Sequence, residues 1–406
     1  MPHPLPVPIR QNVFRRWQAG ERAVAIALAL DLHPRTVQRL VQRFRRCGAD
    51  GVHPAYRRGV AKRQGVPAAV FRAALAMRHV HPRWGAPLIR VLLGHRFPRR
   101  FLVCARTLQR WFRHAGLGPP AKGNYPAAKD YHRADKAHEG WQMDAAEQLT
   151  LHTGEKVSWL EVVDEHTGAV LDTTVFPEGR FNQVPAERTQ TALRKCFTIW
   201  GLPGRFRVDN GPPWGSKGDL PTDLALWLIG LGVELIWNPP RRPQRNGVVE
   251  RFQGVEQCWA EPESCCSVAE LQRKARRMNR LQREEYPLVG GKSRLEIFPE
   301  LAHSGRNYNL AWEKTHWNLA AVADYLARCT VPRQVDRNGS ISLYNRSRHV
   351  GKPHAGKTVW VTFDPQVMSW IISDSNGNQI RQLSAPEISR ERIMALAVSN
   401  KRPEAH

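Results

Sequence analysis

Apolar and polar positions along the chain change period several times, and each period predicts a different kind of element. Between residues 140 and 176 apolar and polar side chains alternate in three short runs, which is typical of strands with one buried face. The following segments switch between a helical period and short apolar runs. The predicted elements are strands Gly140–Leu149, Lys156–Asp164 and Ala169–Phe176, helix Pro185–Trp200, strand Arg205–Val208, helix Thr222–Gly230, strand Val233–Trp237 and a helix that contains Glu250.

The N-terminal pattern is helical. Arg22–Arg46 fits two helices joined by a short turn, and Pro34 suits the first turn of the second helix. This pair resembles a helix-turn-helix, although Asp31 occupies the turn position where glycine is usual, and short helical hairpins also occur in proteins that do not bind DNA. The side chains expected to face a major groove are Arg35, Gln38, Arg39 and Gln42.

A second helical region follows in Pro67–Gly116, with a turn at Trp84-Gly85 and a C-terminal glycine at Gly116. Its last helix would expose Arg106, Thr107, Gln109, Arg110 and Arg113. The alternative is a plain helical bundle with solvated arginines. Between the two regions the basic segment Tyr56–Gly65 suits a minor groove, and Gly118–Lys136 has the composition of a linker.

The pattern changes again after the Glu250 helix. Ser267–Tyr286 reads as a basic amphipathic helix, which is either a solvated connector or a helix that lies on DNA. Short alternating runs then predict a small β-barrel, with strands Ile341–Asn345, Lys357–Phe363, Met368–Ser373 and Asn378–Leu383. The tail from Ser389 is expected to be helical and then disordered.

Charge is distributed unevenly over these regions. The net charge is +25 over 406 residues, and residues 1–140 hold 27 Lys and Arg against 6 Asp and Glu. The remaining residues hold 34 and 30, so the basic excess is a property of the N-terminal part. Because neutralising phosphates supplies most nucleic-acid affinity, this asymmetry indicates a polyanionic partner.

Composition further limits the classes of protein to which the chain can belong. The sequence has no apolar run of about 18 residues, which predicts no membrane span. Its start, MPHPLPVPIR, is too short and too rich in proline for a signal peptide. The seven cysteines show no CxxC pair, which favours free thiols in a reducing cytoplasm. We therefore expect a cytoplasmic protein.

Three acids stand at places where such elements can bring them together. Asp144 lies in an alternating strand, Asp209 follows a short strand, and Glu250 lies at the start of a helix after Asn246-Gly247. Converging carboxylates repel one another unless a divalent cation lies between them, and oxygen ligands suit Mg²⁺ or Mn²⁺. Taken by itself, Glu250 is also consistent with a surface ion pair, because four arginines lie near it in the sequence: Arg241, Arg242, Arg245 and Arg251.

The three motifs QMD, VDNG and PxxPQxNGxxER resemble the acid triad of DDE transposases and retroviral integrases, above all bacterial insertion-sequence transposases with an integrase-type core. The likeness extends over about residues 20–385 and is strongest at 140–255. The chain departs from the family in two respects. Forty residues separate Asp209 from Glu250 where thirty-five are commonest, and Gln257 stands where a basic residue is frequent.

This resemblance implies a fold and an activity. It implies an RNase H-like α/β catalytic core after N-terminal helix-turn-helix units and before a barrel, with domains at 1–60, 61–118, 139–262 and 331–389, a linker at 119–138, a helical connector at 263–330 and a tail at 390–406. It implies a transposase that binds terminal inverted repeats and that cleaves and joins strands with two Mg²⁺ or Mn²⁺ ions held by Asp144, Asp209 and Glu250. The implied partners are element ends, target DNA and further copies of the chain, with a helper ATPase undetermined.

Other readings remain open from sequence alone. A domesticated or decayed transposase would bind DNA without catalysis, and a simple metal nuclease would leave the helix-turn-helix units without a role. In the core, Asn246 would brace the Glu250 helix or contact DNA, whereas Asp164 and His166 are interpreted as turn residues and Glu147 as solvated. Arg241, Arg242, Arg245 and Arg251 are the predicted DNA contacts beside Glu250.

Overall fold

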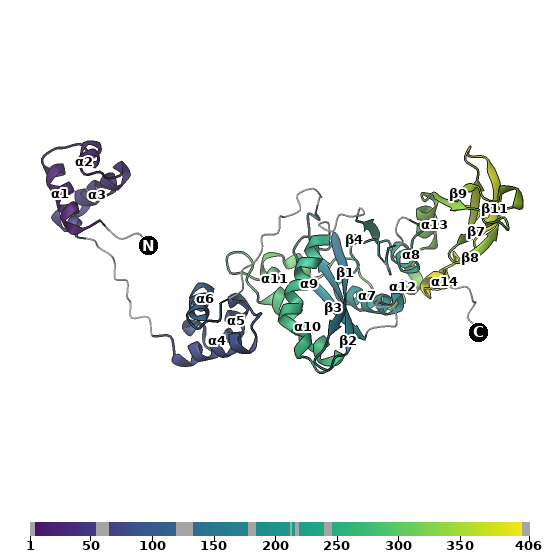
Figure 1. Ribbon diagram of the computed structural model, residues 1–406, viewed down its shortest axis with the longest axis horizontal. Helices are drawn as coiled ribbons and strands as arrows, with labels where there is room; N and C mark the ends of the chain where they lie inside the picture. The colour runs from purple at the N-terminus through teal and green to yellow at the C-terminus, as the bar shows by residue number, and fades with distance from the viewer. Residues whose placement is uncertain are drawn as a thin grey trace. The chain divides into compact units, whose positions relative to one another are not determined.

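The computed structural model describes residues 5–53, 65–118, 133–177, 184–211, 213–215, 219–238 and 246–399. The chain divides into two compact units, residues 1–68 and 69–406 (Figure 1). Among the described residues, no helix is long and apolar enough to cross a membrane.

The first unit is a three-helix bundle of α1 (Val7–Gln18), α2 (Ala23–Ala29) and α3 (Pro34–Cys47), closed by a short 3-10 turn, Gly48–Val52. The predicted pair of helices is confirmed, whereas α1 was not anticipated because its proline-rich start conceals the helical period. Asp31 has a φ of +49°, so the turn before α3 does require the left-handed conformation that glycine usually supplies. The apolar faces of the three helices meet in one core around Ile26, Leu40 and Phe44.

The second unit begins with α4 (Ala68–Val80), α5 (Ala86–Gly94) and α6 (Ala105–His114). Their core includes Leu88, Ile89 and Phe112, but it continues into side chains from two later helices, α9 (Gly247–Ala260) and α10 (Val268–Glu284). The Trp84 indole donates a hydrogen bond to the Trp259 carbonyl at 3.2 Å. These helices therefore share their core with the α/β part of the chain.

A mixed five-stranded sheet forms the centre of the second unit, in the order β3-β2-β1-β4-β5. Its strands are β1 (Gly140–Thr150), β2 (Lys156–Asp164), β3 (Val170–Pro177), β4 (Arg205–Val208) and β5 (Glu234–Trp237). The first three pair antiparallel, whereas β4 pairs parallel to both β1 and β5. The expected sequence of three strands followed by alternating helices and strands is confirmed, and this part of the chain is an α/β fold with a mixed sheet.

Helices cover both faces of this sheet (Figure 1). On one face α7 (Ala186–Trp200) and α8 (Asp223–Gly230) bury Trp141, Met143 and neighbouring apolar side chains. On the other face α9 packs on β1 and β2, and α10 packs along β3. Successive side chains of a strand point to opposite faces, so strands buried on both faces read as nearly continuous apolar runs.

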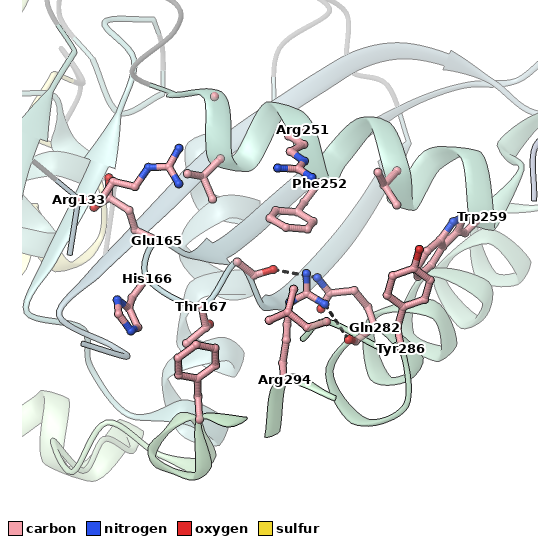
Figure 2. Close-up of a pocket in the computed structure, with 16 residues that line it drawn as sticks. Arg133, Glu165, His166, Thr167, Arg251, Phe252, Trp259, Gln282, Tyr286 and Arg294 are labelled. Atoms are coloured by element: carbon pink, nitrogen blue, oxygen red, sulfur yellow. Dashed lines mark hydrogen bonds between the residues drawn. The ribbon is translucent and has the colours of Figure 1, made fainter. Parts of the chain in front are cut away.

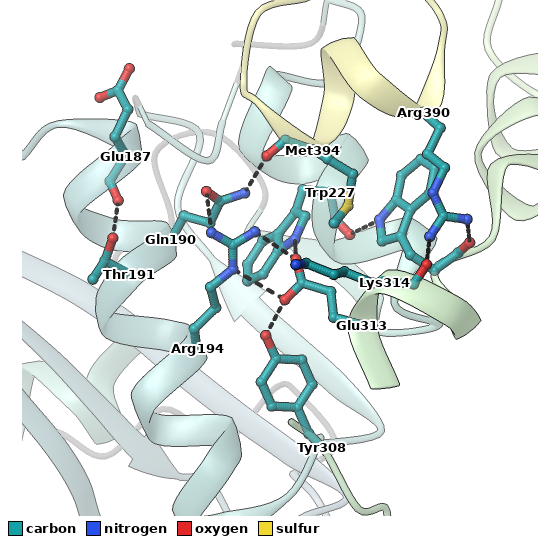
Figure 3. Close-up of polar contacts among 11 residues, drawn as sticks. Glu187, Gln190, Thr191, Arg194, Trp227, Tyr308, Glu313, Lys314, Arg390 and Met394 are labelled. Atoms are coloured by element: carbon teal, nitrogen blue, oxygen red, sulfur yellow. Dashed lines mark hydrogen bonds and ion pairs between the residues drawn. The ribbon is translucent and has the colours of Figure 1, made fainter. Parts of the chain in front are cut away.

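The C-terminal part contains α11 (Arg294–Ile297), α12 (Leu310–His316), α13 (Leu319–Ala327), β6 (Val331–Gln334), β7 (Ser340–Leu343), β8 (Arg346–His349), β9 (Thr358–Asp364), β10 (Ser369–Ser373), β11 (Gln379–Ser384) and α14 (Arg390–Met394). A buried polar network ties it to the core (Figure 3). Glu313 accepts hydrogen bonds from Arg194 at 2.6 and 3.1 Å and from Trp227 at 3.1 Å.

The predicted small barrel is not confirmed. Within the described residues the strands form a four-stranded sheet, β11-β10-β9-β6, and a separate hairpin, β7-β8, with no ladder between them. The strand predicted at Ile341–Asn345 ends early, because Tyr344 and Asn345 both adopt positive φ and make the two-residue turn of the hairpin. Closure of a barrel needs hydrogen-bonded pairing around the full ring, which the alternating pattern of single strands does not specify.

Candidate active site

Asp144 and Asp209 lie on neighbouring parallel strands at the same level. The pairing between β1 and β4 ends at Gln142 opposite Arg207, and each aspartate lies two residues beyond that pair. Asp144 is half-buried within β1, whereas Asp209 is exposed just after the end of β4. The parallel register thus brings together two acids that are 65 positions apart in the sequence.

Glu250 reaches the same edge from the first turn of α9. The Gln142 side chain accepts a hydrogen bond from the backbone N–H of Val249 at 3.1 Å, and this contact fixes the start of α9 against β1. Asn246, immediately before the helix, is only 4% exposed. Its side chain caps no backbone N–H of α9, so the bracing role stays a prediction.

The three carboxyl groups act on one another electrostatically. The pKa of Asp144 is raised to about 7, mainly by burial, and the negative charges of Asp209, Glu250 and Glu147 contribute to this rise. Desolvation also raises the pKa of Glu250, although its side chain remains exposed. A cation near Asp144 would offset the charges of its neighbours and would therefore stabilise the ionised form of its carboxyl group.

The donor set fits a hard divalent ion in its chemistry, since all three side chains offer oxygens. Within the part of the chain that the structure describes, however, no three His, Cys, Asp or Glu side chains are close enough to hold a metal ion together. The three carboxyl groups thus act on one another's charge, but they are too far apart to hold one ion together.

The loop after β4 holds Asp209 through a residue that the sequence did not indicate. The indole N–H of Trp214 donates a hydrogen bond to the Asp209 carboxylate. A Cβ at Gly211 would lie 2.9 Å from the Asp209 Oδ2, so a small residue is needed there. The side-chain amide of Asn210 donates to the Asn238 carbonyl and so ties this loop to the end of β5. Pro212 lies outside the described residues.

Two further acids of this region were not indicated by the sequence. Glu161 stands directly opposite Asp144 on β2, and Glu256 lies on α9. Both are fully buried; burial raises the pKa of Glu256 to about 8, and burial and the charge of Glu256 raise that of Glu161 well above its ordinary range. For Glu161, the sequence signal was a single acid in the otherwise apolar run Trp159–Val163.

The turn between β2 and β3 has the structural role expected of it. The Asp164 carboxylate accepts hydrogen bonds from the backbone N–H and hydroxyl of Thr167, at 2.8 and 2.7 Å, and from the His138 N–H at 2.7 Å. His166 is exposed and hydrogen-bonds the Ala134 carbonyl at 3.0 Å. Neither residue belongs to the acid cluster.

The predicted DNA-contact side chains are mostly on the surface. Those of α3 and α6 that are exposed are Arg35, Gln38, Arg39, Gln42, Arg106, Gln109, Arg110 and Arg113. Thr107 is half-buried, and its hydroxyl lies 3.4 Å from the Cys104 sulfur. Arg251 is exposed beside Glu250, whereas Arg241, Arg242 and Arg245 lie outside the described residues.

Comparisons with known proteins agree with the N-terminal interpretation. A helix-turn-helix domain model matches residues 9–60, and a homeodomain-like domain model matches residues 36–112. Over 114 residues the chain is 31% identical to the Gag-Pro-Pol polyprotein of Mason-Pfizer monkey virus, which is 27% of this chain and 6% of the polyprotein. The chain spans only a small part of that relative's length. The two domain models thus cover the helices that the sequence predicted to bind DNA.

Solved structures with a similar course of the chain include retroviral integrases. The catalytic core of BIV integrase is 19% identical over 40% of this chain and 95% of that chain, with a TM-score of 0.31. The HTLV-2 integrase catalytic core in complex with magnesium is 17% identical over 41% and 99%, with a TM-score of 0.31. The simian T-cell lymphotropic virus intasome in complex with a PP2A regulatory subunit is 13% identical over 77% and 96%, with a TM-score of 0.35.

Proposed function

We propose that this protein is a DNA transposase that binds the terminal inverted repeats of a mobile element and then cleaves and joins DNA strands. The observation that supports the proposal is the placement of the acids: Asp144 and Asp209 each lie two residues beyond the last pair of the parallel strands β1 and β4, and Glu250 lies in the first turn of α9, whose start is hydrogen-bonded to β1. The helix-turn-helix domains would bind the DNA. The excess of basic residues in 1–140 would attract the DNA phosphates.

Each part of the site has a role in this proposal. Asp144 and Asp209 would hold one divalent ion, and Asp144 and Glu250 the other. Such ions, when bound, stabilise the attacking and leaving oxygens of a phosphoryl displacement. Trp214 orients the Asp209 carboxylate through its hydrogen bond, and Gln142 keeps the start of α9, and with it Glu250, against β1.

The test separates chemistry from binding. Asp144→Asn, Asp209→Asn and Glu250→Gln keep the side-chain size but remove a charged oxygen ligand each. We expect each full-length variant to lose strand transfer with Mg²⁺ or Mn²⁺, by at least about a hundredfold, while its affinity for the element ends stays within twofold of wild type. Lys156→Gln, which changes an exposed side chain of β2, is the matched control and should retain activity. Strand transfer at normal rates by any of the three variants would show that the triad is assigned wrongly.

A second candidate function shares the N-terminal observations. A transposase-derived protein that binds DNA without catalysis would have the same helix-turn-helix matches and the same excess of basic residues in 1–140. Wild-type protein that binds an element end but neither nicks nor joins it, with either metal, would support this alternative. Activity in the same assay would exclude it.

A further inference from the structure

A cavity of about 390 Å³ lies beside the acid cluster on the neighbouring side of α9. It is enclosed by α9, the turn between β2 and β3, the end of α10 and the segment around α11 (Figure 2). Gly247, Val248 and Arg251 from the first turns of α9 line it, whereas Glu250 does not. The volume is within the range of roughly 300–1,000 Å³ that is usual for small-ligand sites.

The cavity has an excess of positive charge. Arg294 is 4% exposed, its Nε has no partner among the described residues, and one terminal N–H donates only to the Gln282 carbonyl at 3.2 Å. Arg251 and Arg294 face the same cavity, and the charge of Arg251 acts unfavourably on Arg294. In the described part of the chain, neither guanidinium makes an ion pair with a carboxylate.

Nearby acids do not neutralise this charge. Glu165 is the acid that lines the cavity in the described structure, and it already pairs with Arg207 at 3.0 Å. Glu256 acts favourably on Arg294, but the same carboxyl group also faces Arg283, and burial raises its pKa to about 8. A buried cation without a paired anion is costly, and an incoming anion would remove that cost.

Aromatic side chains complete the lining. Figure 2 shows Arg251 and Phe252 projecting from α9, with Arg294 facing them and Tyr286 next to Trp259 at one end. The Arg294 guanidinium lies over the Phe252 ring at 5.1 Å, and the Tyr286 and Trp259 rings are 4.9 Å apart. Phe298 closes another part of the wall. Aromatic rings and arginine planes are the surfaces on which unpaired bases stack.

We propose that this cavity binds one nucleotide, with its phosphate at Arg251 and Arg294 and its base against Phe252, Tyr286 and Phe298. Phosphate alone would leave the aromatic wall without a role, and an apolar ligand would leave the arginines uncompensated. The nucleotide is an unpaired residue of the DNA strand that passes Glu250, because Glu250 and Arg251 are consecutive on α9. This part of the proposal rests on the proposed transposase function.

Photochemical crosslinking of the full chain tests the site without requiring catalysis. The probe is a short duplex with a three-nucleotide single-stranded overhang that carries 5-iodo-2′-deoxyuridine, in buffer without divalent metal. We expect crosslinked peptides that contain Phe252, Tyr286 or Phe298. Arg251→Gln and Phe298→Leu should each lower the yield roughly tenfold. Arg277→Gln, an equal charge change at an exposed position of α10, is the control and keeps the yield.

Three outcomes bear on the proposal. Crosslinks confined to α3 and α6, or an equal loss of yield in Arg251→Gln and Arg277→Gln, would overturn it, provided that thermal melting shows the variants to be folded. Competition by excess dTMP would show that the cavity also takes free nucleotides. Crosslinks that persist under excess dTMP would show that it takes a nucleotide held in a strand.

The two proposals fail separately. Asp144→Asn should abolish strand transfer and leave these crosslinks unchanged. Wild-type protein that crosslinks at the cavity but never joins DNA would contradict the transposase function alone. Wild-type protein that joins DNA while its crosslinks map elsewhere would contradict the nucleotide site alone.

Discussion

The two helix-turn-helix regions are built in different ways. The helices α1–α3 bury their apolar faces against one another, and the core around Ile26 and Phe44 contains side chains of the first unit alone. The helices α4–α6 bury theirs partly against α9 and α10, through Trp259, Met278 and Leu281. Similar sequence patterns therefore give one region with its own core and another whose core is completed by the helix that carries Glu250.

Polar contacts reinforce this difference. Trp84 donates to the Trp259 carbonyl, His81 lies 2.6 Å from the Glu261 carboxylate, and His95 lies 2.5 Å from that of Glu285. In the proposed transposase, this shared core would join the second DNA-binding region to the catalytic helix. The core of the first region, as far as the structure describes it, contains no side chain of α9 or α10.

The largest expected effect comes from dividing the chain. A fragment of residues 1–60 should fold by itself and unfold cooperatively, since its core is complete. A fragment of residues 65–118 should lack a cooperative transition, because the partners from α9 and α10 are missing. Circular dichroism during heating measures both. A sharp transition in the second fragment would show that the shared core is not needed.

Trp259→Ala should weaken the second region from within the full chain. Truncation of a buried tryptophan costs about 3–5 kcal/mol, and here the lost contacts are those that hold α4–α6. Denaturant unfolding gives the free energy, and limited proteolysis should show earlier cleavage within residues 65–118. Trp360→Ala, at a side chain that is 41% exposed, is the control and should change stability little. Equal effects of the two substitutions would contradict the comparison.

A smaller effect should appear with pH. Burial raises the pKa of Glu256 on α9 from an ordinary value of 4.5 to about 8. The folded chain therefore keeps a proton that the unfolded chain loses, so stability is highest below about pH 4.5 and falls as the pH rises towards 8. Glu256→Gln should remove this loss and add roughly 2–4 kcal/mol to the free energy of unfolding at pH 8.5.

The measurement is denaturant unfolding at pH 5 and pH 8.5. Glu284→Gln, at an exposed position of α10, serves as the control and should leave the pH dependence unchanged. The isolated fragment 1–60 contains none of these groups, and its stability should not follow the same curve. A wild-type chain that is equally stable at both pH values would show that Glu256 does not titrate in this range.

Much of the architecture follows from the sequence alone. The alternation of apolar and polar residues predicted β1 to β3, and a helical period predicted α7, α8 and α9. Both patterns depend only on residues a few positions apart, so the sequence is enough to recognise them. The motifs around Asp144, Asp209 and Glu250 indicated the candidate site, and parallel pairing of β1 with β4 puts the first two side by side. The assignment of these acids as catalytic remains a prediction.

The tertiary structure decided what depends on distant partners. Strand alternation did not determine whether β6–β11 close into a ring, and they form two sheets. Glu161 and Glu256 look like ordinary surface acids in the sequence, yet packing of α9 on the sheet buries both. The contact of Trp214 with Asp209 and that of Trp84 with Trp259 are likewise set by how elements dock. A local pattern specifies which face of an element is apolar, whereas the partner of that face is fixed only when the whole chain packs.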